Sequence, residues 1–183
     1  MKKLLITGFD PFGGELVNPA YEAVCLLPDV IAEIVLCKLE VPTEFVRSGA
    51  VLRDALAAER PDAVLCVGQA GGRAAVTPEM VAINLQYASI ADNAGKMPKD
   101  VPVVSGGPAA YFSTLPVRKM AETIKVAGLP GAVSYSAGSF VCNDLLYRLL
   151  HHFDGTSTRV GFIHVPYLPE QAKNGAPAME LSD

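Results

Sequence analysis

Cys142 stands at the start of an apolar helical pattern, directly after the strand-like segment 132–135. A strand-to-helix turn places a side chain at the mouth of an α/β sheet, where unpaired helix N–H groups favour negative charge. We therefore predict that Cys142 is a reactive thiolate, which attacks carbonyl carbon at neutral pH. The alternative is a buried core cysteine. That alternative suits Cys25, Cys37 and Cys66, because they lie inside apolar periodic segments.

A cysteine nucleophile needs a base, and the chain contains three histidines. His151 and His152 follow Cys142 in the same predicted helix at a distance of roughly 13 to 15 Å, given a rise of about 1.5 Å per residue. They cannot reach the thiol, and we place them at the helix C-terminus, where positive charge suits the helix dipole. His164 closes a predicted strand and would emerge at the carboxyl edge of a parallel sheet, where such sheets bind ligands. His164 is therefore the predicted base.

An acid is needed to orient the imidazole of that base. Glu79 is attractive because it adjoins an apolar strand, whereas most glutamates lie on solvated surfaces. Asp10 and Asp92 remain competitors for this role.

Apolar runs alternate with helical patterns along the chain. This alternation predicts an α/β fold, a three-layer α/β/α sandwich with a mostly parallel, twisted mixed sheet, formed by residues 1–183 as a single domain. We expect strands at 4–9, 31–39, 62–68, 80–85, 131–135 and 159–164. Helices are expected at 19–27, 117–124 and 142–152, and one more is expected to begin after Thr43. Asn18 is the predicted N-cap of the first helix, and Thr43 is the predicted N-cap of the helix that follows it. Residues 92–108 are expected to form a long surface loop.

Composition excludes several classes of function. The net charge is −4 and no basic stripe with interleaved aromatic residues is present, so nucleic acid is not an expected partner. No stretch approaches the roughly 18 apolar residues that span a bilayer, so no membrane is expected. The four cysteines show neither a disulfide framework nor metal-ligand spacing. We expect a cytoplasmic protein without a metal or cofactor.

Four segments together make the chain resemble the pyroglutamyl peptidase I family, the pyrrolidone-carboxylate peptidases, which are cytoplasmic cysteine peptidases. The segments are Thr7–Gly14 with Asn18-Pro19, Gly68–Gly71 leading to Thr77–Glu79 and Val81–Asn84, Ala137–Asn143, and His164–Pro166. They span nearly the whole chain in the family's order. A single one of them would be poor support.

The resemblance implies a catalytic triad of Glu79, Cys142 and His164. Cys142 would attack the carbonyl that follows an N-terminal pyroglutamyl residue, forming a thioester that water then hydrolyses. The backbone N–H of Cys142 would stabilise the oxyanion. The resemblance also implies peptides with N-terminal pyroglutamate as partners and a homo-oligomer, a dimer or a tetramer.

The pyroglutamyl ring is a neutral lactam, so its pocket would need apolar walls and a few hydrogen bonds. The resemblance implies eight lining residues: Phe9, Phe12 and Phe140 around the ring, Asn18 and the backbone around Gln69 at its polar edge, and Thr43, Ile90 and Val141 along the remainder. For Phe9 and Val141, ordinary core packing is a strong alternative.

The chain departs from the family pattern at Met80 and Ser89, where a basic residue and an arginine are usual. It also stops soon after Pro177–Leu181, where relatives usually begin a final helix, so a missing C-terminal helix is left open. Two other functions stay in consideration. One is a Cys/His amidase or thioesterase of different specificity, and the other is a non-catalytic lactam-binding protein. A protein that only binds gives no reason to expect unusually fast alkylation of Cys142 near neutral pH, so the rate of alkylation would distinguish it from an enzyme.

Overall fold

The computed structural model describes residues 1–183, and its centre is one six-stranded sheet. The strands, in spatial order, are β2 (Val30–Ile31), β3 (Ile34–Val41), β1 (Lys2–Phe9), β4 (Ala63–Gln69), β8 (Arg159–Val165) and β5 (Thr77–Pro78). The four inner strands β3, β1, β4 and β8 pair in parallel, and the edge strands β2 and β5 are antiparallel to their neighbours. The predicted mostly parallel, mixed sheet is confirmed.

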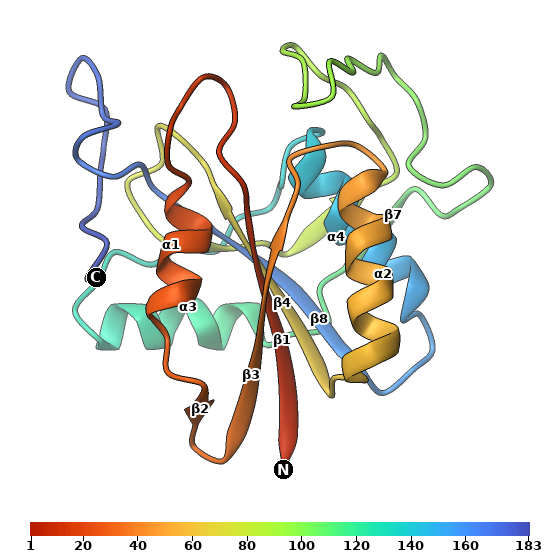
Figure 1. Ribbon diagram of the computed structural model, residues 1–183, viewed down its shortest axis with the longest axis horizontal. Helices are drawn as coiled ribbons and strands as arrows, with labels where there is room; N and C mark the ends of the chain where they lie inside the picture. Colours follow the sequence, from red (N-terminus) through yellow and green to blue (C-terminus); the bar gives the residue numbers. More distant parts are fainter.

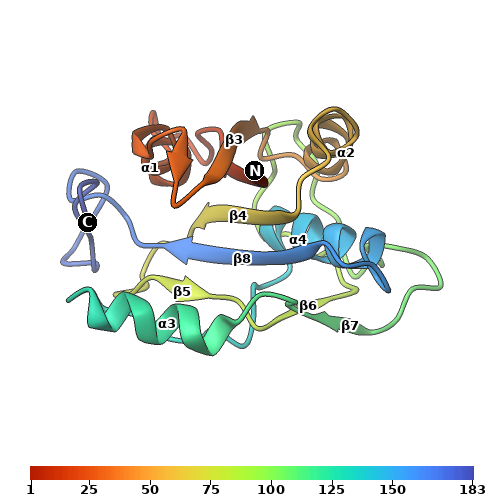
Figure 2. The same cartoon turned by 90° about the horizontal axis from the view of Figure 1, so that it is seen from below.

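Helices cover both faces of the sheet. Helices α1 (Pro19–Leu26) and α3 (Val117–Val126) lie on one side, and α2 (Arg47–Glu59) and α4 (Val141–His152) lie on the other (Figures 1 and 2). A separate two-stranded antiparallel sheet, β6 (Val81–Ile83) with β7 (Ala110–Phe112), packs beside α4. The predicted three-layer α/β/α arrangement is confirmed.

The inner strands are apolar along their length because both of their faces are covered. Successive side chains alternate between the two layers. Leu5 and Cys66 pack in the large core cluster with α2 and α4, whereas Ile6 and Val67 pack in a smaller cluster with α1. The two clusters hold the carboxyl ends of β1, β4 and β8 side by side, which is where the predicted chemistry should lie.

Three local predictions differ from the structure. The expected strand 31–39 is a hairpin, because Ala32 and Glu33 take left-handed φ values of 47° and 66° and turn β2 back on β3. The expected strand 131–135 forms only two isolated bridges to its neighbours. Thr43 does not cap α2, which begins after Val46 without a side-chain cap, because Thr43 is bonded to Asp10 instead.

The segment 92–108 contains no helix or strand beyond one isolated bridge, in agreement with the predicted loop. It rises beside the upper end of α2 in Figure 1. None of the helices combines the length and the apolar character that crossing a membrane requires.

Candidate active site

His164 lies near the carboxyl end of β8, opposite Gly68 of β4 and Thr77 of β5. The absence of a side chain at residue 68 leaves room for the thiol. A Cβ atom there would stand 3.1 Å from the Sγ of Cys142 and 2.7 Å from the Cζ of Phe162. The ring of Phe162 in turn packs against the imidazole, with 4.7 Å between ring centroids. The thiol and the ring of Phe162 therefore both lie against Gly68, and the imidazole packs on that ring.

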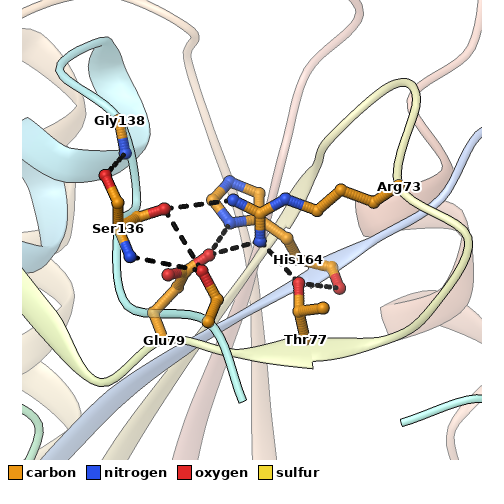
Figure 3. Close-up of polar contacts among 7 residues, drawn as sticks. Arg73, Thr77, Glu79, Ser136, Gly138 and His164 are labelled. Atoms are coloured by element: carbon orange, nitrogen blue, oxygen red, sulfur yellow. Dashed lines mark hydrogen bonds and ion pairs between the residues drawn. The ribbon is translucent and has the colours of Figure 1, made fainter. Parts of the chain in front are cut away.

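Glu79 is the acid that meets the histidine. Its carboxylate is fully buried, and its Oε1 lies 2.6 Å from the Nδ1 of His164 (Figure 3). The two competitors bond elsewhere: Asp10 accepts from the backbone N–H of Thr43, and Asp92 accepts from that of Phe45. Among the three candidate acids, Glu79 alone orients the imidazole, and its bond to Nδ1 leaves Nε2 for a substrate or the thiol.

Arg73 is a site residue that the sequence analysis did not select. Its Nη1 donates to Glu79 Oε1 and to Thr77 Oγ1, both at 2.6 Å, and its Nη2 donates to the carbonyl of Ser136 at 3.1 Å. The available signal was a single cation after two glycines, just beyond a strand that ends at the ligand-binding edge of the sheet. That signal places Arg73 near a site but does not say what it contacts.

The pKa values of the acid and the base both lie below their ordinary values. Burial alone would raise the pKa of Glu79, but the hydrogen bond and charge of His164, together with the hydrogen bond from Arg73, act against burial and the pKa is lowered. For His164, burial lowers the pKa, the bond to Glu79 raises it, and the positive charge of Arg73 lowers it further. The resting pair at neutral pH is therefore a carboxylate and a neutral imidazole.

The chain turns into α4 just before Cys142. Gly138 takes a φ of 77°, which glycine adopts without strain, and Phe140 occupies the N-cap position without a side-chain hydrogen bond. The first N–H groups of α4, including that of Cys142, thus have no capping side chain and are free to bind a negatively charged oxygen. Asn143 fixes this helix start by donating to the carbonyls of Ile83 and Leu85.

The thiolate predicted from the helix start is not the resting form of Cys142. Burial raises the pKa of this thiol to about 12, and the nearby negative charge of Glu79 adds to that effect. Arg73 and the helix N–H act in the opposite direction but do not overcome burial. The prediction weighed the helix dipole without the desolvation that the folded site imposes, and the side chain of Cys142 is partly buried where it lines the cavity. The resting site holds a neutral thiol beside a neutral imidazole, with no hydrogen bond between them.

A cavity of about 280 Å³ opens in front of the thiol. Its walls include Cys142 and His164 together with six of the eight predicted lining residues: Phe9, Phe12, Asn18, Thr43, Gln69 and Phe140. The other two predicted lining residues, Ile90 and Val141, do not line the cavity. Ile90 is an exposed loop residue, and Val141, the first residue of α4, is buried in the core. At a helix start, Phe140 and Cys142 face the cavity while the residue between them faces inward.

The polar side chains of the cavity differ in how fully they are engaged. Asn18 caps α1 through Oδ1 and donates from Nδ2 to the carbonyl of Asp10, and the hydroxyl of Thr43 donates to that same carbonyl. Both residues therefore shape the loop that carries Phe12. By contrast, the Oε1 of Gln69 is buried without a partner, which leaves an acceptor for a ligand.

The remaining cysteines and the two departures lie away from the cavity. Cys66 is buried, as predicted for a core cysteine, but Cys25 is exposed and Cys37 is half-buried, so that prediction was wrong for Cys25. Met80 and Ser89 do not line the cavity, and Ser89 is exposed. No cluster of three or more histidine, cysteine or acidic side chains is arranged to hold a metal ion.

A thiol, an imidazole and a buried carboxylate at one edge of an α/β sheet, beside a small aromatic cavity, are the components of a cysteine hydrolase. Comparison with known proteins agrees with this class. The sequence profile of the pyroglutamyl peptidase family matches residues 2–183, and the chain belongs to this family.

Relatives in this family are similar over nearly their whole length. The pyrrolidone-carboxylate peptidase of Levilactobacillus brevis is 53% identical over 185 aligned positions, covering 99% of this chain and 91% of the relative. The crystal structure of pyroglutamyl peptidase I from Bacillus amyloliquefaciens superimposes with a TM-score of 0.96 at 49% identity, covering 100% of this chain and 90% of that one. A mutant pyrrolidone carboxyl peptidase from Pyrococcus furiosus gives a TM-score of 0.93 at 39% identity, covering 98% and 91%.

Proposed function

We propose that this chain removes N-terminal pyroglutamyl residues from peptides, with Cys142 as nucleophile, His164 as general base and acid, and Glu79 as the orienting acid. The observation that carries this proposal is the bond between His164 and the buried Glu79 at the wall of the same cavity that Cys142 lines. Membership of the pyroglutamyl peptidase family supports the choice of substrate.

The neutral resting pair defines the order of proton transfers. As the sulfur of Cys142 attacks the carbonyl carbon after the pyroglutamyl ring, the thiol proton passes to Nε2 of His164. The oxygen that becomes negative is held by the free N–H groups at the start of α4. When the carbon–nitrogen bond breaks, the imidazolium returns its proton to the departing amine, leaving a thioester. Water then attacks the thioester while His164 accepts its proton, and 5-oxoproline leaves as the thiol re-forms.

The cavity supports a small neutral ring as the group that is bound. The rings of Phe12 and Phe140 lie 6.3 Å apart and tilted, and Phe45 fixes Phe140 from behind in an edge-on contact at 5.3 Å. These walls suit the two faces of a five-membered lactam. The unpartnered Oε1 of Gln69 is the acceptor that we assign to the lactam N–H. No free cation lines the cavity to favour an acidic side chain, since the one guanidinium there is bonded to Glu79.

Hydrolysis of a pyroglutamyl-arylamide by the purified chain tests the proposal. We expect Cys142→Ala to abolish release of the arylamine and His164→Ala to reduce it strongly. A panel of other N-terminally blocked arylamides serves as the specificity control, because a diverged amidase would cleave these and spare the pyroglutamyl substrate. Full activity without the thiol would refute the mechanism.

We further infer that the chain acts in the cytoplasm, as one peptidase domain over residues 1–183, and as a homo-oligomer, a dimer or a tetramer. Four free cysteines suit a reducing compartment. Light scattering on the purified protein measures the oligomeric mass, and a monomer at assay concentration would remove the last of these inferences.

A further inference from the structure

Arg73 occupies a position between the acid of the site and the wall of the substrate cavity. It follows β4 in the loop that starts after Gln69, and its side chain extends over Glu79 toward Ser136 (Figure 3). Only 29% of the side chain is exposed, and it forms an ion pair with a carboxylate that is fully buried. Its two terminal nitrogens point to different partners, so its charge and its forked shape can be considered separately.

The charge of Arg73 acts on the bond between acid and base. The guanidinium and the imidazole share one oxygen, Oε1 of Glu79, each at 2.6 Å, while Oε2 is buried without a partner. A buried carboxylate with histidine as its sole partner would pull the imidazole toward its protonated form. A second cation on the same oxygen neutralises the carboxylate and opposes that pull. His164 then stays neutral, as a base must be before it accepts a proton.

The forked shape of Arg73 acts on the wall of the cavity. Nη2 donates to the carbonyl of Ser136, whose N–H and Oγ are bonded to Ser134 Oγ and to the N–H of Gly138. Segment 134–138 contributes Ser136, Ala137 and Gly138 to the cavity and leads directly into α4. One side chain therefore joins the acid of the triad to the segment that faces the substrate.

No other cation can take this place. The titratable and charged groups around His164 are Glu79 from the end of β5, Arg73 from the loop after β4, and Cys142 from α4. Arg73 is the only lysine or arginine that lines the cavity, and Met80 and Ser89 carry no charge.

We propose that Arg73 is a positioning residue for the peptidase reaction, with its charge keeping His164 neutral and its fork fixing segment 134–138 against the substrate. This role rests on the proposed function. A merely structural ion pair would add stability but would not alter the titration of the histidine or separate kcat from KM.

The test combines a titration that needs no activity with kinetics that do. Because the chain has three histidines, proton NMR of the ring signals, assigned with His151→Gln and His152→Gln, follows His164 directly. The variants are Arg73→Met, which removes the charge, and Arg73→Lys, which keeps a charge but cannot span both partners. Arg118→Met is the matched control. The Nη1 of Arg118 lies 3.3 Å from the hydroxyl of Tyr135 on the exposed side of segment 134–138, and Arg118 has no contact with Glu79.

In Arg73→Met we expect the pKa of His164 to rise and the acid limb of the kcat/KM profile to move to higher pH. We also expect kcat to fall by about 10- to 150-fold, the range for a lost charge-assisted hydrogen bond. Arg73→Lys should leave the limb in place and raise KM, and Arg118→Met should match the wild type. An unmoved titration in Arg73→Met, or an equal shift in Arg73→Lys, would overturn the proposal. If Arg73→Met does not fold by circular dichroism, the KM of Arg73→Lys decides: a wild-type value also overturns it.

These outcomes are distinct from failure of the proposed function. Absence of pyroglutamyl-arylamide cleavage in the wild type would refute the function, while the NMR titration would still report whether Arg73 governs His164. Activity in the wild type together with an unmoved titration in Arg73→Met would refute the inference alone.

Discussion

Glu79→Gln is the most informative change to the site, because it preserves the shape of the side chain and removes its charge. In the native protein the fully buried carboxylate accepts from His164 and Arg73 at 2.6 Å each. An amide in its place offers these two donors only a neutral oxygen. The imidazolium that forms during attack therefore loses its counter-charge at the moment when it is most needed.

The magnitude follows from the bond that is lost. A hydrogen bond to a charged partner contributes about 1.5–3 kcal/mol, which corresponds to a fall in kcat/KM of about 10- to 150-fold. Folding stability should also fall, by about 1–3 kcal/mol, because the change removes the charged acceptor of two hydrogen bonds, while the guanidinium is 29% exposed and still has Thr77 and Ser136 as acceptors.

The pH dependence gives the sharpest check. Since Glu79 raises the pKa of His164, its neutralisation should lower that pKa, so the acid limb of kcat/KM should move to lower pH. The wild-type carboxylate has a lowered pKa, so its contribution to stability is present above about pH 4.5 and is lost as the pH falls through the native value. Glu79→Gln should not show that loss.

The assay is pyroglutamyl-arylamide hydrolysis from about pH 4.5 to 8.5, together with urea unfolding over the same range and below pH 4.5, where the contribution of the carboxylate should be lost. Glu59→Gln is the matched control, because Glu59 forms an ion pair with Lys3, at the opposite end of β1 from the site, in which the two side chains are 40% and 41% exposed. It should leave the limb and the rate unchanged. A Glu79→Gln enzyme with an unshifted or raised acid limb would show that the carboxylate does not govern the imidazole, and the reasoning from the shared oxygen would fall.

Three further predictions follow from the same geometry. Gly68→Ala should lower kcat/KM at least about tenfold and reduce the free energy of unfolding by about 1–3 kcal/mol. The reason is that the added Cβ would lie 3.1 Å from Cys142 Sγ and 2.7 Å from Phe162 Cζ. A variant with the melting temperature and the rate of the wild type would contradict this. In the resting protein, iodoacetamide should alkylate the exposed Cys25 before Cys142 at pH 7, as peptide mass spectrometry can resolve, because desolvation raises the pKa of the Cys142 thiol. Slow alkylation is thus expected of the peptidase as well as of a lactam-binding protein, and preferential alkylation of Cys142 would show a resting thiolate and favour the peptidase. Because the pKa of His164 is lowered, its contribution to stability is complete above about pH 6.5 and is lost as the pH falls below that value, a loss that urea unfolding should detect in the wild type and not in His164→Asn.

The parts of the fold that the sequence predicts are those governed by local pattern. The apolar runs of β1, β4 and β8 are continuous because helices cover both faces of the sheet, so they stand out in the sequence. Asn18-Pro19 marks the start of α1 because an amide cap and a fixed φ are local requirements. The segment 131–135 was expected as a strand, but its neighbours pair with it only at isolated bridges. Strand pairing depends on segments that are distant in the sequence, so it cannot be predicted from the residues of this segment alone.

The candidate site divides in the same way. The residue types and their places at the ends of strands were enough to select Cys142 and His164 and to expect an acid, since chemistry constrains those choices. Two features depended on distances that no spacing encodes. One is the contact of Arg73 with Glu79, and the other is the burial that outweighs the helix N-terminus and keeps the thiol protonated.

The protonation state of the resting site connects these features. A permanent thiolate in a small aromatic cavity would be costly to desolvate and would react with any electrophile that entered. Here desolvation disfavours the thiolate of Cys142, and the charge of Arg73 opposes the pull of the shared carboxylate toward a protonated His164. In the proposed mechanism the nucleophile is generated only when a carbonyl lies against the uncapped N–H groups of α4, because stabilisation of the developing oxyanion is absent from the resting site. Selectivity for a bound amide would thus arise from the same burial that makes the free thiol slow to react.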